Sequence, residues 1–176
     1  MHTRVRRAAL AALVLALSGC DAAESYRGDG KLVDNGLFAA TDRYVLDLGP
    51  AALERANTTT YRIENLPNEE FVFGIRVTRP GPGPSLMNGS SILAVVALEL
   101  MDRDGAILMR REGPLNEWTW NVPSTGDWAF AYGRENPSTY FTPGRGPLRL
   151  TLTVLRPDPN ATVYAPRIVA TTGGWK

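Results

Sequence analysis

The stretch SILAVVALELMDRDGAILMRRE, residues 91–112, has the form strand, turn, strand. Ile92–Leu100 is apolar at nearly every position, and Ala106–Glu112 opens with a second apolar run. Between them, Asp102-Arg103-Asp104-Gly105 has the composition of a tight turn, in which glycine adopts the positive φ that other residues avoid. We therefore predict a β-hairpin. Because Ile92–Leu100 is apolar on both faces, we expect a central strand that is covered on both sides.

The chain on either side of this hairpin repeats the pattern of short apolar clusters separated by Gly, Pro, Asn and Asp. Only Ala51–Ala56 has a helical pattern, and Lys31–Ala39 adds a short first hairpin around Asp34-Asn35-Gly36. Strands without crossover helices between them must pair antiparallel. We predict one all-β domain over residues 31–176, an antiparallel β-sandwich of about 8–9 strands. The expected strands are Tyr44–Leu48, Thr58–Asn65, Glu70–Thr78, Ser91–Met101, Ala106–Glu112, Glu117–Val122, Asp127–Gly133, Pro147–Leu155 and Thr162–Ala170.

Two of these strands are rich in aromatic residues. In Glu117–Val122 the tryptophans alternate with polar residues, and in Asp127–Gly133 the aromatics alternate with alanine. Pairing Trp118 with Phe130, and Trp120 with Trp128, would place all five aromatics (Trp118, Trp120, Trp128, Phe130 and Tyr132) on one face. We therefore expect these aromatics to pack together in the core.

The body of the chain resembles jelly-roll and C2-like sandwiches of carbohydrate-binding and accessory modules. The resemblance is one of rhythm: a glycine hairpin, a tryptophan strand and a late Leu-x-Leu-x-Val strand. It implies a fold more than a function. The segments that carry it are Leu100–Gly105, Trp118–Trp120, Gly126–Tyr132 and Leu148–Val154.

The N-terminus has the regions of an export signal. A basic start with Arg4, Arg6 and Arg7 precedes the apolar run Ala8–Leu17, which is too short to span a bilayer. Leu17-Ser18-Gly19-Cys20 then resembles the lipobox of bacterial lipoproteins.

This resemblance implies removal of a signal peptide, residues 1–19, and a diacylglyceryl group on Cys20. Residues 20–30 would then be a flexible tether to a membrane. Asp21 resembles the signal that retains many lipoproteins at the periplasmic face of the inner membrane, with the outer membrane as the alternative.

Composition excludes several functions. The single histidine is His2 and the single cysteine is Cys20, so the domain itself has no Ser–His or Cys–His catalytic pair, no ordinary zinc site and no disulfide. Without Arg4, Arg6 and Arg7 of the signal peptide, the chain has 16 basic and 18 acidic residues, which gives a formal charge of −2. Nothing in this balance favours nucleic acid as a partner. We expect no cofactor and no metal.

Carboxylates leave one enzymatic route open. Glu99 interrupts an apolar strand, and with Glu112, Glu117 or Asp127 it would supply the pair of acids that a hydrolase requires. The alternative is that Glu99 forms an ion pair with an arginine or lies at the strand end in water. The carboxylates of Asp102 and Asp104 likewise suit a calcium loop or simply a hairpin turn, and we favour the turn.

Two loops carry candidate binding residues. Tyr140, Phe141 and Arg145 suit recognition of a partner or of a glycan, unless the aromatics fold down and cap the core. Leu86 and Met87, in the proline-rich loop 80–90, suit an apolar tip that binds a partner, unless the loop is only a long connection of the sandwich with an apolar plug.

These residues lead us to expect a protein that is not an enzyme. It would be a lipid-anchored sandwich that binds or scaffolds an envelope protein, with an immunity or inhibitor lipoprotein as a variant. The alternatives are a carbohydrate-binding module and a carboxylate-only hydrolase.

Overall fold

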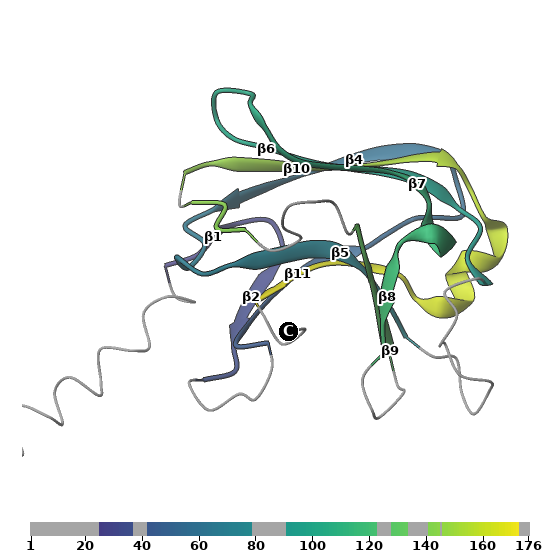
Figure 1. The fold of residues 1–176 in the computed structure, drawn as a ribbon, viewed down its shortest axis with the longest axis horizontal. Helices are drawn as coiled ribbons and strands as arrows, with labels where there is room; N and C mark the ends of the chain where they lie inside the picture. Colours follow the sequence, from purple (N-terminus) through teal and green to yellow (C-terminus); the bar gives the residue numbers. More distant parts are fainter. Residues whose placement is uncertain are drawn as a thin grey trace, which may run out of the picture.

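The computed structural model describes residues 25–36, 42–78, 91–122, 128–133, 141–144 and 146–172. These residues form two antiparallel β-sheets packed face to face, so the predicted all-β sandwich is confirmed (Figure 1). Sheet A has five strands and sheet B has six. In spatial order, sheet A consists of β1 (Arg27–Gly28), β4 (Asn57–Glu64), β10 (Leu148–Arg156), β6 (Val95–Met101) and β7 (Ile107–Pro114). Sheet B consists of β2 (Lys31–Asp34), β3 (Tyr44–Pro50), β11 (Arg167–Thr172), β5 (Phe71–Thr78), β9 (Trp128–Tyr132) and β8 (Thr119–Asn121).

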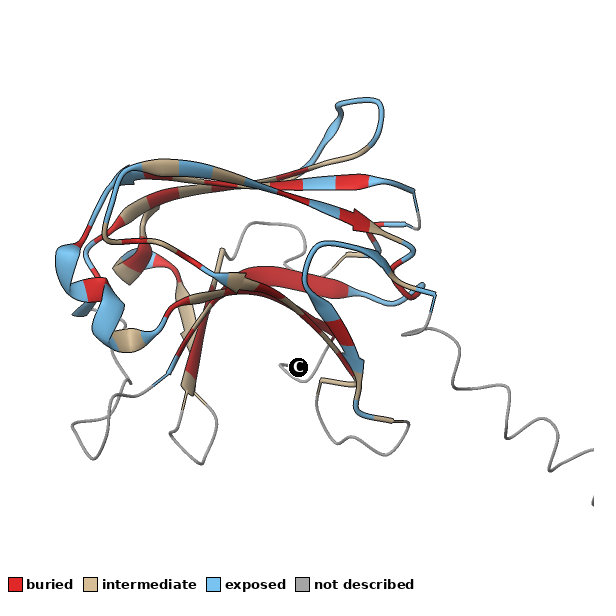
Figure 2. Ribbon diagram, turned by 180° about the vertical axis from the view of Figure 1, so that it is seen from behind, coloured by how far each residue is buried: buried red, intermediate tan, exposed pale blue. Residues whose placement is uncertain are grey.

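The main core lies between the sheets, where strands from both layers turn alternate side chains inward (Figure 2). In β6, Val96, Leu98 and Leu100 are buried, while the residues between them are only partly buried. The expectation that this strand is covered on both faces is therefore wrong. Its outer residues are only partly buried, because sheet B packs against the other face of sheet A.

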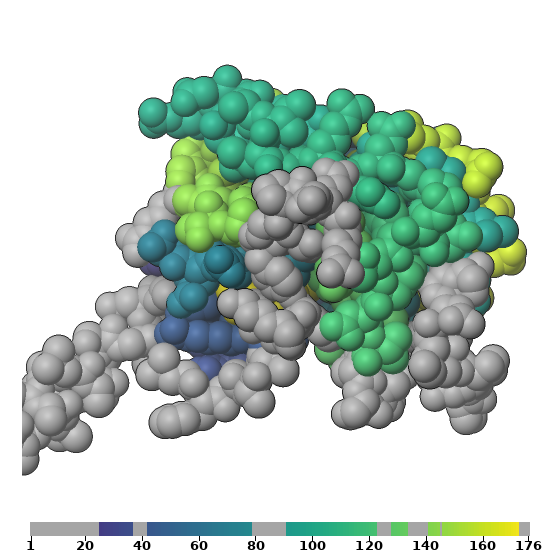
Figure 3. All heavy atoms as spheres, in the orientation of Figure 1, coloured from purple at the N-terminus to yellow at the C-terminus, as the bar shows by residue number. Residues whose placement is uncertain are grey.

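The predicted β6–β7 hairpin is confirmed, and it lies at the top of the molecule in Figure 3, with its turn at the upper left. A carboxylate oxygen of Asp102 accepts hydrogen bonds from the backbone N–H groups of Asp104 and Ala106, both at 2.9 Å. Gly105 has φ 84°, the conformation that glycine adopts without strain. Asp102 is thus engaged in closing a turn, as an aspartate commonly is.

The predicted register of the aromatic hairpin is wrong by three residues, an odd shift that places the aromatics of the two strands on opposite faces. Trp120 pairs with Ala131, and Asn121 pairs with Phe130. Trp118 and Trp120 therefore pack with the main core, together with the alanines of β9. Trp128, Phe130 and Tyr132 lie on the opposite face of sheet B. There they join a second apolar cluster around Val72 and Val169.

A glycine in the neighbouring strand makes room for this second cluster. In β5, Gly74 pairs with Tyr132, next to the Arg76–Phe130 pair. A Cβ atom at residue 74 would lie 2.9 Å from Cζ of Phe130 and would also clash with the backbone carbonyl of Ala131. The absence of a side chain at Gly74 lets β5 and the ring of Phe130 approach closely.

Three further expectations differ from the structure. Ala51–Ala56 is not helical, because its backbone forms tertiary hydrogen bonds instead: Ala51 donates to Pro166, and Leu53 accepts from Asp158. The expected strand Thr162–Ala170 begins as the 3₁₀ turn η3 (Pro159–Tyr164), and β11 starts only at Arg167. A second 3₁₀ turn, η2 (Leu115–Glu117), replaces the start of the expected strand Glu117–Val122. Part of the expected hairpin Lys31–Ala39, residues 37–39, lies outside the described residues.

The close packing at Gly74 predicts that Gly74→Ala lowers the free energy of unfolding by about 1–3 kcal/mol, the usual cost of overpacking. Gly146→Ala is a matched control, because a Cβ atom there meets no other atom within 4 Å. Equilibrium unfolding in urea measures both. Equal stability of the two variants would contradict the packing of Phe130 over Gly74.

Candidate functional site

Sheet B is curved, and its outer face is concave (Figure 1). The strands β2 and β3 form one flank of the concavity and β8 and β9 form the other, with β11 and β5 between them. Because side chains alternate along each strand, this face receives the residues that point away from the main core. It is the face that carries the second apolar cluster.

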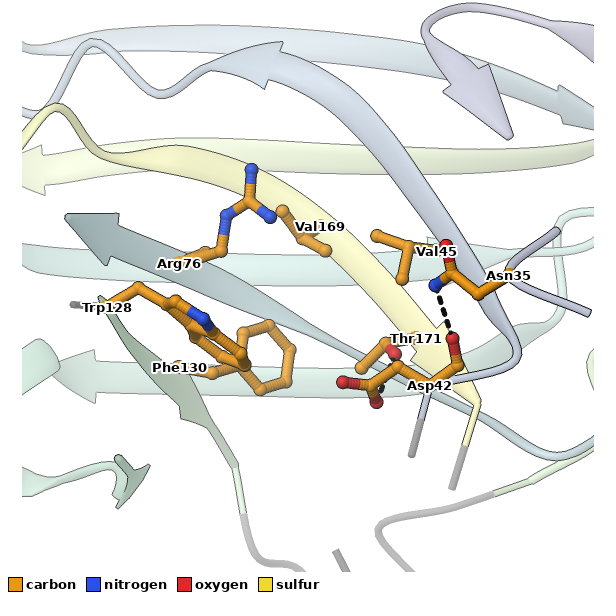
Figure 4. A pocket seen from close by; sticks show the side chains of 8 residues that line it. All are labelled: Asn35, Asp42, Val45, Arg76, Trp128, Phe130, Val169 and Thr171. Atoms are coloured by element: carbon orange, nitrogen blue, oxygen red, sulfur yellow. Dashed lines mark hydrogen bonds between the residues drawn. The ribbon is translucent and has the colours of Figure 1, made fainter. Parts of the chain in front are cut away.

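A pocket of about 240 Å³ opens on this concave face (Figure 4). Residues from β3, β5, β9 and β11 and from the connection between β2 and β3 line it. They are Asn35, Asp42, Val45, Arg76, Trp128, Phe130, Val169 and Thr171. The pocket therefore combines aromatic, aliphatic, cationic and anionic groups, a combination typical of ligand sites.

The middle of the pocket is apolar. Phe130 and Val169 are buried, and Val45 and Trp128 pack against them with part of their surface exposed. Phe130 is stacked on Tyr132, with 5.7 Å between ring centroids. The floor is held in place by packing on both sides, so its shape does not depend on a ligand.

One end of the pocket is cationic. Arg76 lies beside Arg167, and Asp47 of β3 bridges the two guanidinium groups. Arg167 Nε donates to both carboxylate oxygens of Asp47, at 2.8 and 3.1 Å, whereas Arg76 Nη2 donates more weakly, at 3.3 Å. With two guanidinium groups around one carboxylate, this end carries a net positive charge.

The environment of Asp47 favours its ionised form. Partial burial acts to raise the pKa of this carboxyl. The hydrogen bonds from Arg167 and from the backbone N–H of Gly49, with the charges of Arg167 and Arg76, outweigh burial, so the pKa of Asp47 lies below its usual value. Asp47 is therefore a fixed anion that orients Arg76 at the edge of the pocket.

The other end of the pocket is anionic. Thr171 donates its hydroxyl to Asp42 Oδ1 at 2.7 Å, and Asn35 Nδ2 donates to the backbone carbonyl of Asp42 at 2.7 Å. These bonds hold Asp42 at φ 54°, a conformation that few residues other than glycine adopt. Burial raises the pKa of the Asp42 carboxyl, although the bond from Thr171 acts to lower it. Among the described residues, no arginine or lysine forms an ion pair with Asp42.

The structure places Phe141, one of the binding residues singled out from the sequence, away from the pocket. Phe141 stacks on Phe73, with 5.9 Å between ring centroids, and exchanges backbone hydrogen bonds with Phe71. This position favours the alternative that Phe141 caps the core. The other candidate residues, Cys20, Leu86, Met87, Tyr140 and Arg145, lie outside the described residues.

Two of the four candidate catalytic carboxylates, Glu99 and Glu112, form ion pairs, and Glu117 is exposed in η2. Glu99 lies on the outer face of sheet A, 3.8 Å from Arg110 Nη1, and Glu112 contacts the same guanidinium at 3.1 Å. The expected alternative of an arginine partner for Glu99 is thus confirmed. Asp127 lies outside the described residues. Within the described part of the chain, no group of three or more His, Cys, Asp or Glu side chains could hold a metal ion.

The sequence did not single out the residues of this pocket as a site. The sequence pattern places Asn35 in a turn and Trp128 and Phe130 in the core, and it gives no motif at Asp42 or Arg76. The one signal available was Arg76, a charged residue in the otherwise apolar strand Phe71–Thr78. None of the described helices is long and apolar enough to cross a bilayer. Comparison of the sequence with models of protein families gave no match, and comparison with curated proteins gave none.

The ion pairs of Asp47 predict a stability that depends on pH. Because folding lowers the pKa of this carboxyl, its contribution is present above the unfolded value, about 3.9, and is lost as the pH falls through the folded value. At neutral pH we expect Asp47→Asn to lower the free energy of unfolding by about 1–2 kcal/mol. Urea unfolding from neutral pH down to about pH 3 should show this difference shrinking below about pH 4. A difference that stays constant over this range would contradict the assignment.

For Asp42 we predict the opposite effect of an Asp→Asn substitution on the free energy of unfolding. Because burial raises its pKa in the folded state, the ionised carboxylate opposes folding once the pH exceeds the unfolded value. Asn in this position keeps an oxygen to accept from Thr171 and carries no charge, so Asp42→Asn should increase stability at neutral pH. Near about pH 3, where both forms are uncharged, the two proteins should unfold at similar urea concentrations. Destabilisation by Asp42→Asn at neutral pH would show that the carboxylate has a partner that stabilises its charge.

Proposed function

We propose that this chain is a binding protein of the bacterial cell envelope that recognises a partner protein or peptide through the pocket on the concave face of sheet B. The observation that supports the proposal most directly is the pocket itself. It joins an apolar floor to the charged groups of Arg76 and Asp42. Such a combination provides affinity through burial and specificity through a few fixed polar groups.

The construction of the site supports binding rather than catalysis. The positions of Arg76 and Asp42 are set by hydrogen bonds to neighbouring strands, and the floor is part of a packed cluster. A frame of this kind presents its polar groups in fixed positions, which lowers the entropic cost of binding. The candidate acids Glu99 and Glu112 pair with Arg110 on the outer face of sheet A.

The anchor belongs to the same proposal. Lipid on Cys20 would hold the chain at a membrane, with the periplasmic face of the inner membrane favoured by Asp21 and the outer membrane as the alternative. Cys20 lies five residues before Ser25, where the described part of the chain begins. Five extended residues reach about 17 Å. The sandwich would therefore act close to its own membrane, as suits a scaffold or an inhibitor of an envelope protein.

A glycan is the second candidate ligand, because of Trp128. This tryptophan lines the pocket, is partly exposed, and shares the lining with the side-chain amide of Asn35. An exposed indole beside polar groups can stack on a sugar ring while hydrogen bonds orient the hydroxyls. Loss of glycan binding in Trp128→Ala, with unchanged stability, would support this candidate.

Site-specific photocrosslinking in intact cells tests the proposal. A photoreactive residue at Val33, an exposed residue of β2 beside the pocket residue Val45, should capture one envelope partner. The same residue at Thr60, which is exposed on the outer face of sheet A, should capture none and serves as the matched control. Capture from both positions alike, or from neither, would contradict recognition by the concave face. A Cys20→Ala protein that loses the partner would show that the anchor is needed to bring the two together.

A further inference from the structure

The two charged ends of the pocket define its ligand more closely. We propose that the pocket binds a short zwitterionic peptide of about two or three residues, whose carboxylate pairs with Arg76 and whose ammonium pairs with Asp42. This inference rests on the proposed binding function and adds the chemical class of the ligand.

The cationic end has donors to spare. A guanidinium has five N–H donors, and Arg76 gives one to Asp47 in a long bond of 3.3 Å. Arg167, by contrast, is held by two shorter bonds to the same carboxylate. Asp47 is therefore committed to Arg167 more than to Arg76, which leaves Arg76 able to pair with a ligand carboxylate in the forked geometry that such groups prefer.

The anionic end has acceptors to spare. Thr171 occupies one carboxylate oxygen of Asp42, and the other oxygen points across the pocket (Figure 4). Asn35 donates its amide nitrogen to the backbone of Asp42, so its side-chain oxygen is left as an acceptor at the same wall. A partly buried carboxylate with no cation from the described residues is best complemented by a positive group on the ligand.

The distance between the ends suits a short peptide. Thr171 pairs with Val72 across β11 and β5, and Arg76 lies four residues further along β5, which corresponds to roughly 13 Å along the strand. The guanidinium of Arg76 reaches Asp47, which pairs with Val169, only two residues from Thr171 along β11, so the charged groups lie closer together along the strands than this. Two or three extended residues span about 7–10 Å. The volume of about 240 Å³ also lies below the range of pockets for drug-sized ligands.

The middle of the pocket favours a peptide over a sugar. Between the charged ends lie Val45, Val169 and Phe130, none of which offers a side-chain hydrogen bond. A sugar ring would leave hydroxyls without partners over this floor, which is costly. Small aliphatic side chains of a peptide would bury apolar surface there instead.

Titration calorimetry of the mature lipidated protein in detergent tests the proposal, with tri-alanine as the probe. Tri-alanine should bind, and the N-acetylated and the C-amidated forms should each bind about tenfold more weakly or worse, because each has lost one charge. Arg76→Gln should weaken the binding of tri-alanine but leave the binding of its C-amidated form unchanged. Asp42→Asn should weaken the binding of tri-alanine but leave the binding of its N-acetylated form unchanged. Glu99→Gln, on the outer face of sheet A, is the matched control and should bind as the native protein does.

Further outcomes distinguish the failure of this proposal from the failure of the proposed function. Equal affinity for tri-alanine and its two blocked forms would overturn this proposal. Binding of oligosaccharides without binding of tri-alanine would also overturn it. A photocrosslinked partner at Val33 together with no tri-alanine binding would leave the proposed function standing and remove the zwitterionic ligand.

Discussion

The ring of Phe130 over Gly74 is the contact on which the concave face depends. It requires that β9 pairs with β5 in the register that turns Phe130 outward and the neighbouring alanines inward. A shift of one residue would exchange the two faces of β9. In the observed register, small residues let the sheets pack closely, and the large aromatics of β9 build a second apolar cluster. The pocket exists because this register turns the aromatics of β9 to the outer face of sheet B.

The charged groups of sheet B complete the pocket that the apolar cluster begins. Asp47 joins β3 to β11 and β5 through its two arginines, so the ion pairs that link these strands also orient Arg76. Asp42 is held from β11 by Thr171. The charges are thus part of the framework of the sheet. The bonds and charges around Asp47 lower the pKa of its carboxyl, whereas burial raises the pKa of Asp42, so the framework is sensitive to pH in two ways.

The sequence predicted the hairpin of β6 and β7 correctly because the turn is a local structure. Asp102 and Gly105 lie three residues apart. The turn needs only the side-chain oxygen of Asp102 and the positive φ of Gly105. The short segment Ala51–Ala56 was predicted wrongly because its backbone partners, Pro166 and Asp158, are more than 100 residues away. The residues of the pocket were missed for the same reason. Asp42, Arg76 and Thr171 become neighbours only when distant strands pair.

The sequence by itself determined the strands, the antiparallel sandwich and the limits on chemistry that come from a single histidine and a single cysteine. These properties follow from periodicity and composition, which are local or additive. Only the tertiary structure decided which face of β9 is inside, because an alternating pattern of aromatics and alanines is compatible with either register. That choice depends on the fit between Phe130 and Gly74, a contact between strands far apart in the chain, and the position of the candidate site follows from it.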